Sequence, residues 1–179
     1  MFLTNLLRSI VFAIASAVLI FSQNHSVQLG ATVLLIVTAL VGFIGLAVII
    51  RNESKNNLAS NLFASIVCLT IAMFLLTTNG FLGLQNNSGD LLIFRLLTAL
   101  FVLVLAITEF MQGQKAQQGD KLEYRISAAL GLITALVLAL APLNDVNAVG
   151  FLSAYLALSA VQRGIWLATP GKQINNAKK

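Results

Sequence analysis

Charged side chains are scarce in this chain of 179 residues. The 11 Lys and Arg and 6 Asp and Glu make up 9% of it, whereas a soluble domain carries about 25%. So few charges could not cover the surface of a soluble domain, which excludes that class. Disordered segments need low hydrophobicity and high charge, so disorder is excluded as well. Instead, 58% of the residues are hydrophobic and the mean hydropathy is +0.90. The composition indicates an integral membrane protein.

The residues that most often carry chemistry are equally scarce. The single histidine, His25, lies in a polar connection and the single cysteine, Cys68, lies within an apolar stretch, so the chain cannot assemble an internal disulfide or a Cys/His set. The sequence has no GxxxxGK[ST], HExxH or CxxC motif and no acidic cluster for Mg²⁺. We therefore expect no catalytic residues, no metal and no cofactor. No basic patch is interleaved with aromatic residues, which argues against a nucleic-acid partner.

Six apolar stretches are long enough to form helices that cross a bilayer, for which roughly 20 residues suffice. They span about 3–21, 27–50, 58–76, 91–111, 126–143 and 146–167. None shows the alternating pattern of a barrel strand, so we expect an all-α polytopic membrane protein. The first stretch continues well past Ala15-Ser16-Ala17, so we interpret it as a signal anchor and not as a cleaved signal peptide.

Basic residues are concentrated in alternate connections. Ten of the eleven Lys and Arg lie on one side, and the connections on the other side, at 22–26, 77–90 and 143–145, contain none. The positive-inside rule then places both termini in the cytoplasm. A single membrane domain (1–170) is followed by a short basic tail (171–179), and the net charge of +5 makes lipids with anionic headgroups the nearest partner.

The spans pair in chain order as three consecutive helical hairpins, at about 3–50, 58–111 and 126–167. The first and third begin alike, with Arg8-Ser9-Ile10 and Arg125-Ile126-Ser127, which suggests duplication of one unit. Small residues also recur at helical spacing on five spans, and in lipid such faces allow helices to approach closely. These faces are Ser9, Ala13 and Ala17; Thr38, Gly42 and Gly45; Ala64, Cys68 and Ala72; Ala128, Gly131, Ala135 and Ala139; and Ser153, Ala157, Ala160 and Gly164.

The third hairpin shows the repeated unit best, with Arg125, an apolar helix containing Gly131, a turn near Pro142 and a second helix rich in small residues. This unit resembles the short-repeat membrane domain of unknown function found in HdeD-type bacterial proteins, some of which are associated with acid resistance. The resemblance covers about residues 6–169; Arg8 matches in the first copy, and the second copy lacks both Arg and Pro. It implies a six-span protein of the bacterial plasma (inner) membrane with a stress-related or structural role. The resemblance implies no catalytic residues for this chain.

Ionisable residues within the spans are the first candidates for function. Arg95 and Glu109 lie on nearly one face of the fourth span, together with Thr98, but roughly 20 Å apart along the helix. For Arg95 we expect structural pairing or contact with the outer headgroups, near Asp90, with a partner interface or ligand and proton movement as alternatives. For Glu109, near the inner end, we expect an ion pair with Arg163 or Arg125.

Two candidates lie in the outer connections. His25 would gain charge in an acidified exterior and so sense pH; the simpler interpretation is an ordinary loop residue. The apolar segment containing Phe81, Leu82 and Leu84 is a candidate outer contact, or else rests on the headgroups.

Taken together, the residues favour a non-enzymatic protein that works by helix packing, with a homo-oligomer or a larger membrane complex as possible assemblies. The alternatives are an accessory subunit of an energy-converting or pigment-bearing complex and, disfavoured by the few buried polar groups, a transporter of a small solute or protons.

Overall fold

The computed structural model describes residues 2–23, 25–51, 57–77, 88–116 and 118–168, and the elements in these ranges are helical. The helices are α1 (Phe2–Phe21), α2 (Val27–Ile50), α3 (Leu58–Thr77), α5 (Ser88–Lys115), α6 (Gln118–Leu140) and α7 (Asp145–Ala168). Five of them, α2, α3, α5, α6 and α7, are long and apolar enough to cross a membrane, and α1 contributes the shorter apolar stretch Asn5–Phe21. The prediction of a helical protein is confirmed over the described residues, and five of the six predicted spans correspond to helices long and apolar enough to cross a membrane.

Large apolar side chains cover the outside of these helices. Phe21 and Ile50 are each 83% exposed, and Ile14 and Phe43 are each 61% exposed. Soluble proteins rarely expose contiguous apolar patches larger than a few hundred Å². The exposed helix faces are therefore suited to contact with lipid.

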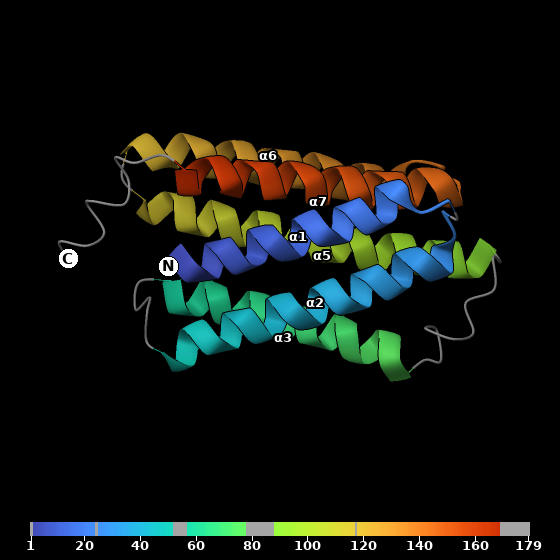
Figure 1. Ribbon diagram of the computed structural model, residues 1–179, viewed down its shortest axis with the longest axis horizontal. Helices are drawn as coiled ribbons and strands as arrows, with labels where there is room; N and C mark the ends of the chain where they lie inside the picture. The colour runs from blue at the N-terminus through green and yellow to red at the C-terminus, as the bar shows by residue number, and fades with distance from the viewer. Residues whose placement is uncertain (1, 24, 52–56, 78–87, 117, 169–179) are drawn as a thin grey trace.

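The helices form a closed ring in chain order. The most extensive contacts join α2 with α3, α5 with α6, and α1 with α7; smaller contacts join α1 with α2, α3 with α5, and α6 with α7. Helices α2, α5 and α7 also contact one another, so they form the centre of the bundle, with α1, α3 and α6 around them. Successive helices run in opposite directions, so α1 begins and α7 ends at the same end of the bundle (Figure 1). We call this the basic end, because Arg51, Lys115 and Arg125 also lie there.

Small residues lie at the close helix contacts. A Cβ added to Gly42 of α2 would lie 2.7 Å from Leu69 Cγ of α3, and one added to Gly131 of α6 would lie 2.8 Å from Ala106 Cβ of α5. Because apolar burial gives little net drive between helices in lipid, close backbone approach and dispersion contacts take its place. The small faces predicted from the sequence on α2 and α6 are thus packing faces.

The buried face of α1 differs from the prediction. Ala13 is exposed, while Ser9 and Ala17 are half-buried. The buried apolar side chains of this helix are Phe12, Ala15 and Leu19. The Phe12 ring packs edge-on against Phe101 of α5, with the ring centroids 6.5 Å apart. A large ring reaches the centre of the bundle where a small residue would leave a void, and this explains why the Phe12 face turns inward.

Two helices also differ from their predicted spans. Helix α5 is 28 residues long and continues to Lys115, and α6 begins at Gln118, about two turns before the expected start at 126. Helix α6 ends at Leu140, ahead of Pro142, because proline has no N–H to donate and disfavours helical backbone at the residue before it. The spanning segments therefore extend into polar sequence at the basic end, which brings polar side chains into contact there.

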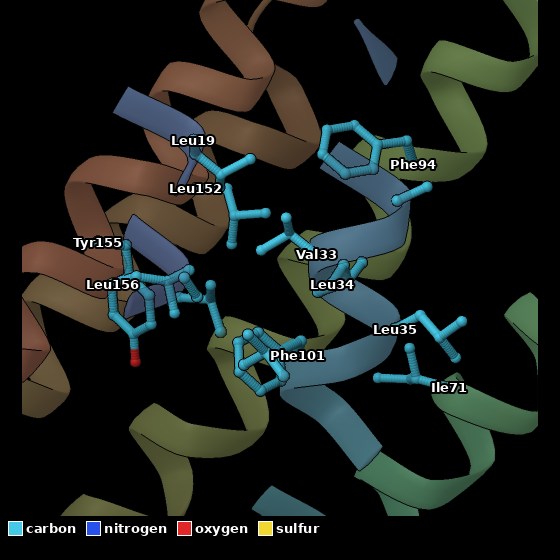
Figure 2. Close-up of a cluster of buried hydrophobic side chains, with 14 of the residues drawn as sticks. Leu19, Val33, Leu34, Leu35, Ile71, Phe94, Phe101, Leu152, Tyr155 and Leu156 are labelled. Atoms are coloured by element: carbon cyan, nitrogen blue, oxygen red, sulfur yellow. The ribbon is translucent and has the colours of Figure 1, made fainter. Parts of the chain in front are cut away.

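Apolar side chains fill the centre of the bundle. Figure 2 shows Phe101 of α5 lying among leucines of α2 and α7. Leu34, Leu152, Leu156 and Phe101 are fully buried. This apolar centre separates the polar groups at the two ends of the bundle.

Candidate functional site

A buried carboxylate joins three helices at the basic end. Arg163 Nη2 of α7 lies 2.5 Å from Glu109 Oε1 of α5, and the two side chains are 15% and 9% exposed, respectively. Ser127 of α6 donates a hydrogen bond from its hydroxyl to the other carboxylate oxygen of Glu109. Hydrogen bonds between ionised groups are shorter and stronger than those between neutral groups. Of the two partners expected for Glu109, the structure places Arg163 in contact and leaves Arg125 exposed.

Arg163 also contacts α1. Its guanidinium carbon lies 5.7 Å from the centre of the Phe12 ring. A cation over an aromatic face is attracted by the ring's quadrupole, and more so when both are desolvated. Arg163 therefore links α7 to both α5 and α1.

The burial of Arg8 was not predicted from the sequence, which placed this residue among the basic residues at the membrane edge. Arg8 is only 5% exposed. Its side chain reaches α2, where a Cβ on Gly45 would lie 3.5 Å from Arg8 Nη2, and its charge interacts with those of Arg163 and Glu109. Arg8 lies one turn before Phe12 on the face of α1 that the structure buries, which is not the face expected from the small residues. The basic end thus buries two guanidinium groups close to Glu109.

Neutral polar side chains add further contacts between helices at this end. Gln112 Nε2 of α5 donates to Asn61 Oδ1 of α3 at 3.3 Å, and Gln162 Nε2 of α7 donates to the carbonyl of Glu123 in α6 at 3.0 Å. Ser9 Oγ of α1 donates to the carbonyl of Ala160 in α7 at 2.9 Å. Interhelical hydrogen bonds in membranes contribute about 0.6 kcal/mol on average. Together these hydrogen bonds join neighbouring helices to one another at the basic end.

A small pocket of about 40 Å³ lies between α1, α5, α6 and α7 at the basic end. Residues of α6 and α7 form most of its lining, including Glu123, Tyr124, Ser127, Arg163 and Trp166. Two of the donors on these residues, Arg163 Nε and the indole N–H of Trp166, are buried and have no hydrogen-bond partner among the described residues. Two residues of the pocket lining therefore carry buried N–H donors without an acceptor among the described residues.

At the opposite end of the bundle, Arg95 of α5 holds the end of α6. Its Nε donates to the carbonyl of Leu138 at 3.0 Å, and its Nη2 donates to the carbonyls of Ala139, at 3.4 Å, and Ala141. The last carbonyls of a helix have no partner within the helix, and a cation there also interacts favourably with the helix dipole. Arg95 is thus a cap for α6, a role that the expected contact with headgroups did not anticipate.

The remaining candidates show no shared site. Thr98 is buried and its hydroxyl donates to the carbonyl of Phe94 in its own helix at 2.8 Å. His25 is half-buried in the connection between α1 and α2. The candidate outer contact, Phe81, Leu82 and Leu84, lies outside the described residues. Within the described ranges, no group of three or more His, Cys, Asp or Glu is placed to hold a metal ion.

Comparisons with known proteins found no matching family model, no matching curated protein and no matching solved structure. The apolar centre of the bundle and its two polar ends are the features on which a function can rest.

Proposed function

We propose that this chain is a non-catalytic integral membrane protein that acts through helix packing and lateral association in the bilayer and carries no solute across it. The apolar filling of the ring supports this proposal. Phe12, Leu34, Phe101 and Leu152 meet at the centre of the bundle, and each is fully buried. A solute or proton path would have to cross this layer.

The positions of the polar groups support the same proposal. Arg95 and Glu109 lie fourteen residues apart on α5, roughly 20 Å along a helix, and each is bonded to α6 at a different end of the bundle. The threonines between them do not bridge this distance. Thr38 and Thr98 direct their hydroxyls to carbonyls of their own helices, at 2.8 Å each.

The ring of contacts supports an origin by repetition of a hairpin. If the chain is divided into the hairpins α1–α2, α3–α5 and α6–α7, the second helix of each hairpin lies at the centre of the bundle and packs against the first helix of the next, with α7 packing against α1 to close the ring. The proposal retains the resemblance to HdeD-type proteins, which rests on the repeated hairpin unit of the sequence. The topology in our proposal is that of a bacterial plasma-membrane protein with both termini in the cytoplasm, because the basic end carries the positive charge that stays on that side.

Reconstitution into liposomes tests the lack of transport. Vesicles that contain the protein should dissipate an imposed proton gradient no faster than empty vesicles, as followed with an internal pH-sensitive dye. Dissipation that increases with the amount of protein and is abolished by Glu109→Gln would overturn the proposal.

Native mass spectrometry of the gently solubilised protein from its own membrane distinguishes a free-standing protein from an accessory subunit. A homo-oligomer, or a monomer that holds lipid, is expected for a free-standing protein of HdeD type. A defined heteromeric mass would instead assign the chain as an accessory subunit, the second candidate from the sequence.

A further inference from the structure

The pocket at the basic end has the surroundings of a lipid headgroup site. It lies near the end of α7 and within the first turns of α6, where Trp166 and Tyr124 contribute amphipathic rings. Such rings are enriched at the depth of the headgroups. Helices α6 and α7 are joined by a short connection at the opposite end and contact one another less than the other neighbours in the ring. The pocket therefore lies between the two neighbouring helices of the ring that contact each other least.

The unpartnered donors define the occupant's chemistry. Arg163 Nε and the indole N–H of Trp166 both belong to residues that line the pocket, and neither has a hydrogen-bond partner among the residues described. A buried donor without an acceptor is unfavourable. The nearby carboxylate of Glu109 is already engaged by Arg163 Nη2 and Ser127. An occupant that satisfies both donors must therefore offer at least two acceptor atoms.

The charge at this end favours an anion. Arg8 lies buried close to Arg163 and Glu109 and adds a second guanidinium group to the cluster. Lys121 and Arg125 lie in the first two turns of α6, so this end of the bundle carries further positive charge outside the pocket lining. Basic pockets between membrane helices on the cytoplasmic side are suited to anionic headgroups.

We propose that this pocket holds the phosphate group of a membrane phospholipid, bound by Arg163 Nε and the indole N–H of Trp166. Its volume of about 40 Å³ exceeds the roughly 10–15 Å³ that a single water needs and accepts one small tetrahedral group, with the rest of the lipid outside. The source of the phosphate is a lipid because the pocket lies at headgroup depth between two helices with lipid-facing surfaces.

Trp166 makes the proposal directly measurable, because it is the single tryptophan of the chain. The detergent-solubilised full chain is titrated with a short-chain phosphatidylglycerol while the fluorescence of Trp166 is recorded. The matched probes are a diacylglycerol with the same acyl chains and inorganic phosphate alone. We expect a saturable change with the phospholipid, no saturable change with the diacylglycerol, and at least tenfold weaker binding of inorganic phosphate.

Two variants connect the binding to the two donors. Trp166→Phe removes the indole N–H and keeps an aromatic ring, and Arg163→Lys keeps the charge that pairs with Glu109 but removes Nε. Each should weaken phosphatidylglycerol binding about tenfold, as measured by native mass spectrometry for Trp166→Phe and by fluorescence for Arg163→Lys. Tyr155→Phe is the control, because Tyr155 lies on the same helix, is buried in the core and does not line the pocket.

The outcomes separate the alternatives. Equal binding of the diacylglycerol would show that the acyl chains alone bind, and would overturn the proposal. Equal binding of inorganic phosphate would retain the phosphate site and overturn the lipid as its source. Unchanged binding in both variants, if they fold as the control does, would show that the phosphate lies elsewhere.

Discussion

Changing Glu109 to leucine leaves Arg8 and Arg163 buried near one another without the carboxylate that pairs with Arg163. Removal of one partner of a buried ion pair destabilises a protein by about 3–5 kcal/mol, because the other charge stays buried without compensation. Arg163 and Glu109 retain 15% and 9% exposure, so some hydration of Arg163 remains. We therefore expect Glu109→Leu to lower the free energy of unfolding by about 3 kcal/mol, at the lower end of this range.

The double variant isolates the interaction from the loss of either side chain. In Glu109→Leu/Arg163→Met both charges are gone, and replacement of a buried pair by apolar residues is often neutral or even stabilising. Arg8 remains buried in this variant, so some of the cost remains. The double variant should be at least about 2 kcal/mol more stable than the sum of the single changes predicts, within the range known for residues in direct contact.

Unfolding in mixed micelles of a mild detergent and dodecyl sulfate, followed by loss of helical circular dichroism, provides the assay. Arg125→Met is the matched control, because it makes the same change at an exposed arginine of the same end and should alter the unfolding free energy by less than about 0.5 kcal/mol. Single changes that add to the double change within about 0.5 kcal/mol would refute the reasoning. The pair would then contribute nothing beyond its separate side chains.

Four further predictions concern packing and capping. Arg95→Met should lower the unfolding free energy by about 1–2 kcal/mol, because it removes the donors for the last carbonyls of α6; Arg125→Met is again the control, and equal effects of the two would contradict the cap. Gly131→Ala should cost about 1–3 kcal/mol, since its Cβ would meet a Cβ of α5 at 2.8 Å. Gly150→Ala should be neutral or stabilising by about 0.5–1 kcal/mol, because a Cβ there meets nothing within 4 Å; equal destabilisation by the two glycine changes would contradict the packing argument. Cysteines in place of Ser9 and its α7 neighbour Ala160 should cross-link on mild oxidation, and failure to do so would contradict the closing contact of the ring.

The sequence predicts well where the helices lie along the chain. It predicts poorly which faces of the helices pack against one another. Length and hydropathy locate the helices because a spanning helix needs a minimum apolar length. They do not specify which faces meet, because these helices are apolar on both their lipid-facing and buried sides. Gly42 and Gly131 carry usable information, since small residues mark close approach. On α1 the same rule selected Ala13, which faces outward.

The candidate site was predictable in part for a similar reason. Charge is so rare in these spans that Arg95 and Glu109 stand out, and only a few opposite charges could pair with Glu109. The burial of Arg8 was harder to predict, because a basic residue near the start of a span usually lies in the headgroups. The capping of α6 by Arg95 could not be read from the sequence at all, since backbone carbonyls are its partners and any residue supplies them.

Arg95 and Glu109, the two charged residues within the apolar part of α5, both form hydrogen bonds with α6. Helix α6 is the least buried of the five spanning helices, with 28% of its most apolar window buried against 50% in α2 and α5. Arg95 binds its last carbonyls, and Glu109 accepts a hydrogen bond from its Ser127. Helix α6 packs extensively on α5 but contacts its other neighbour, α7, much less, so the polar contacts at its two ends reinforce a single packing surface. Because the two contacts lie at opposite ends of α6, loss of one should loosen only its own end and leave the rest of α6 packed on α5.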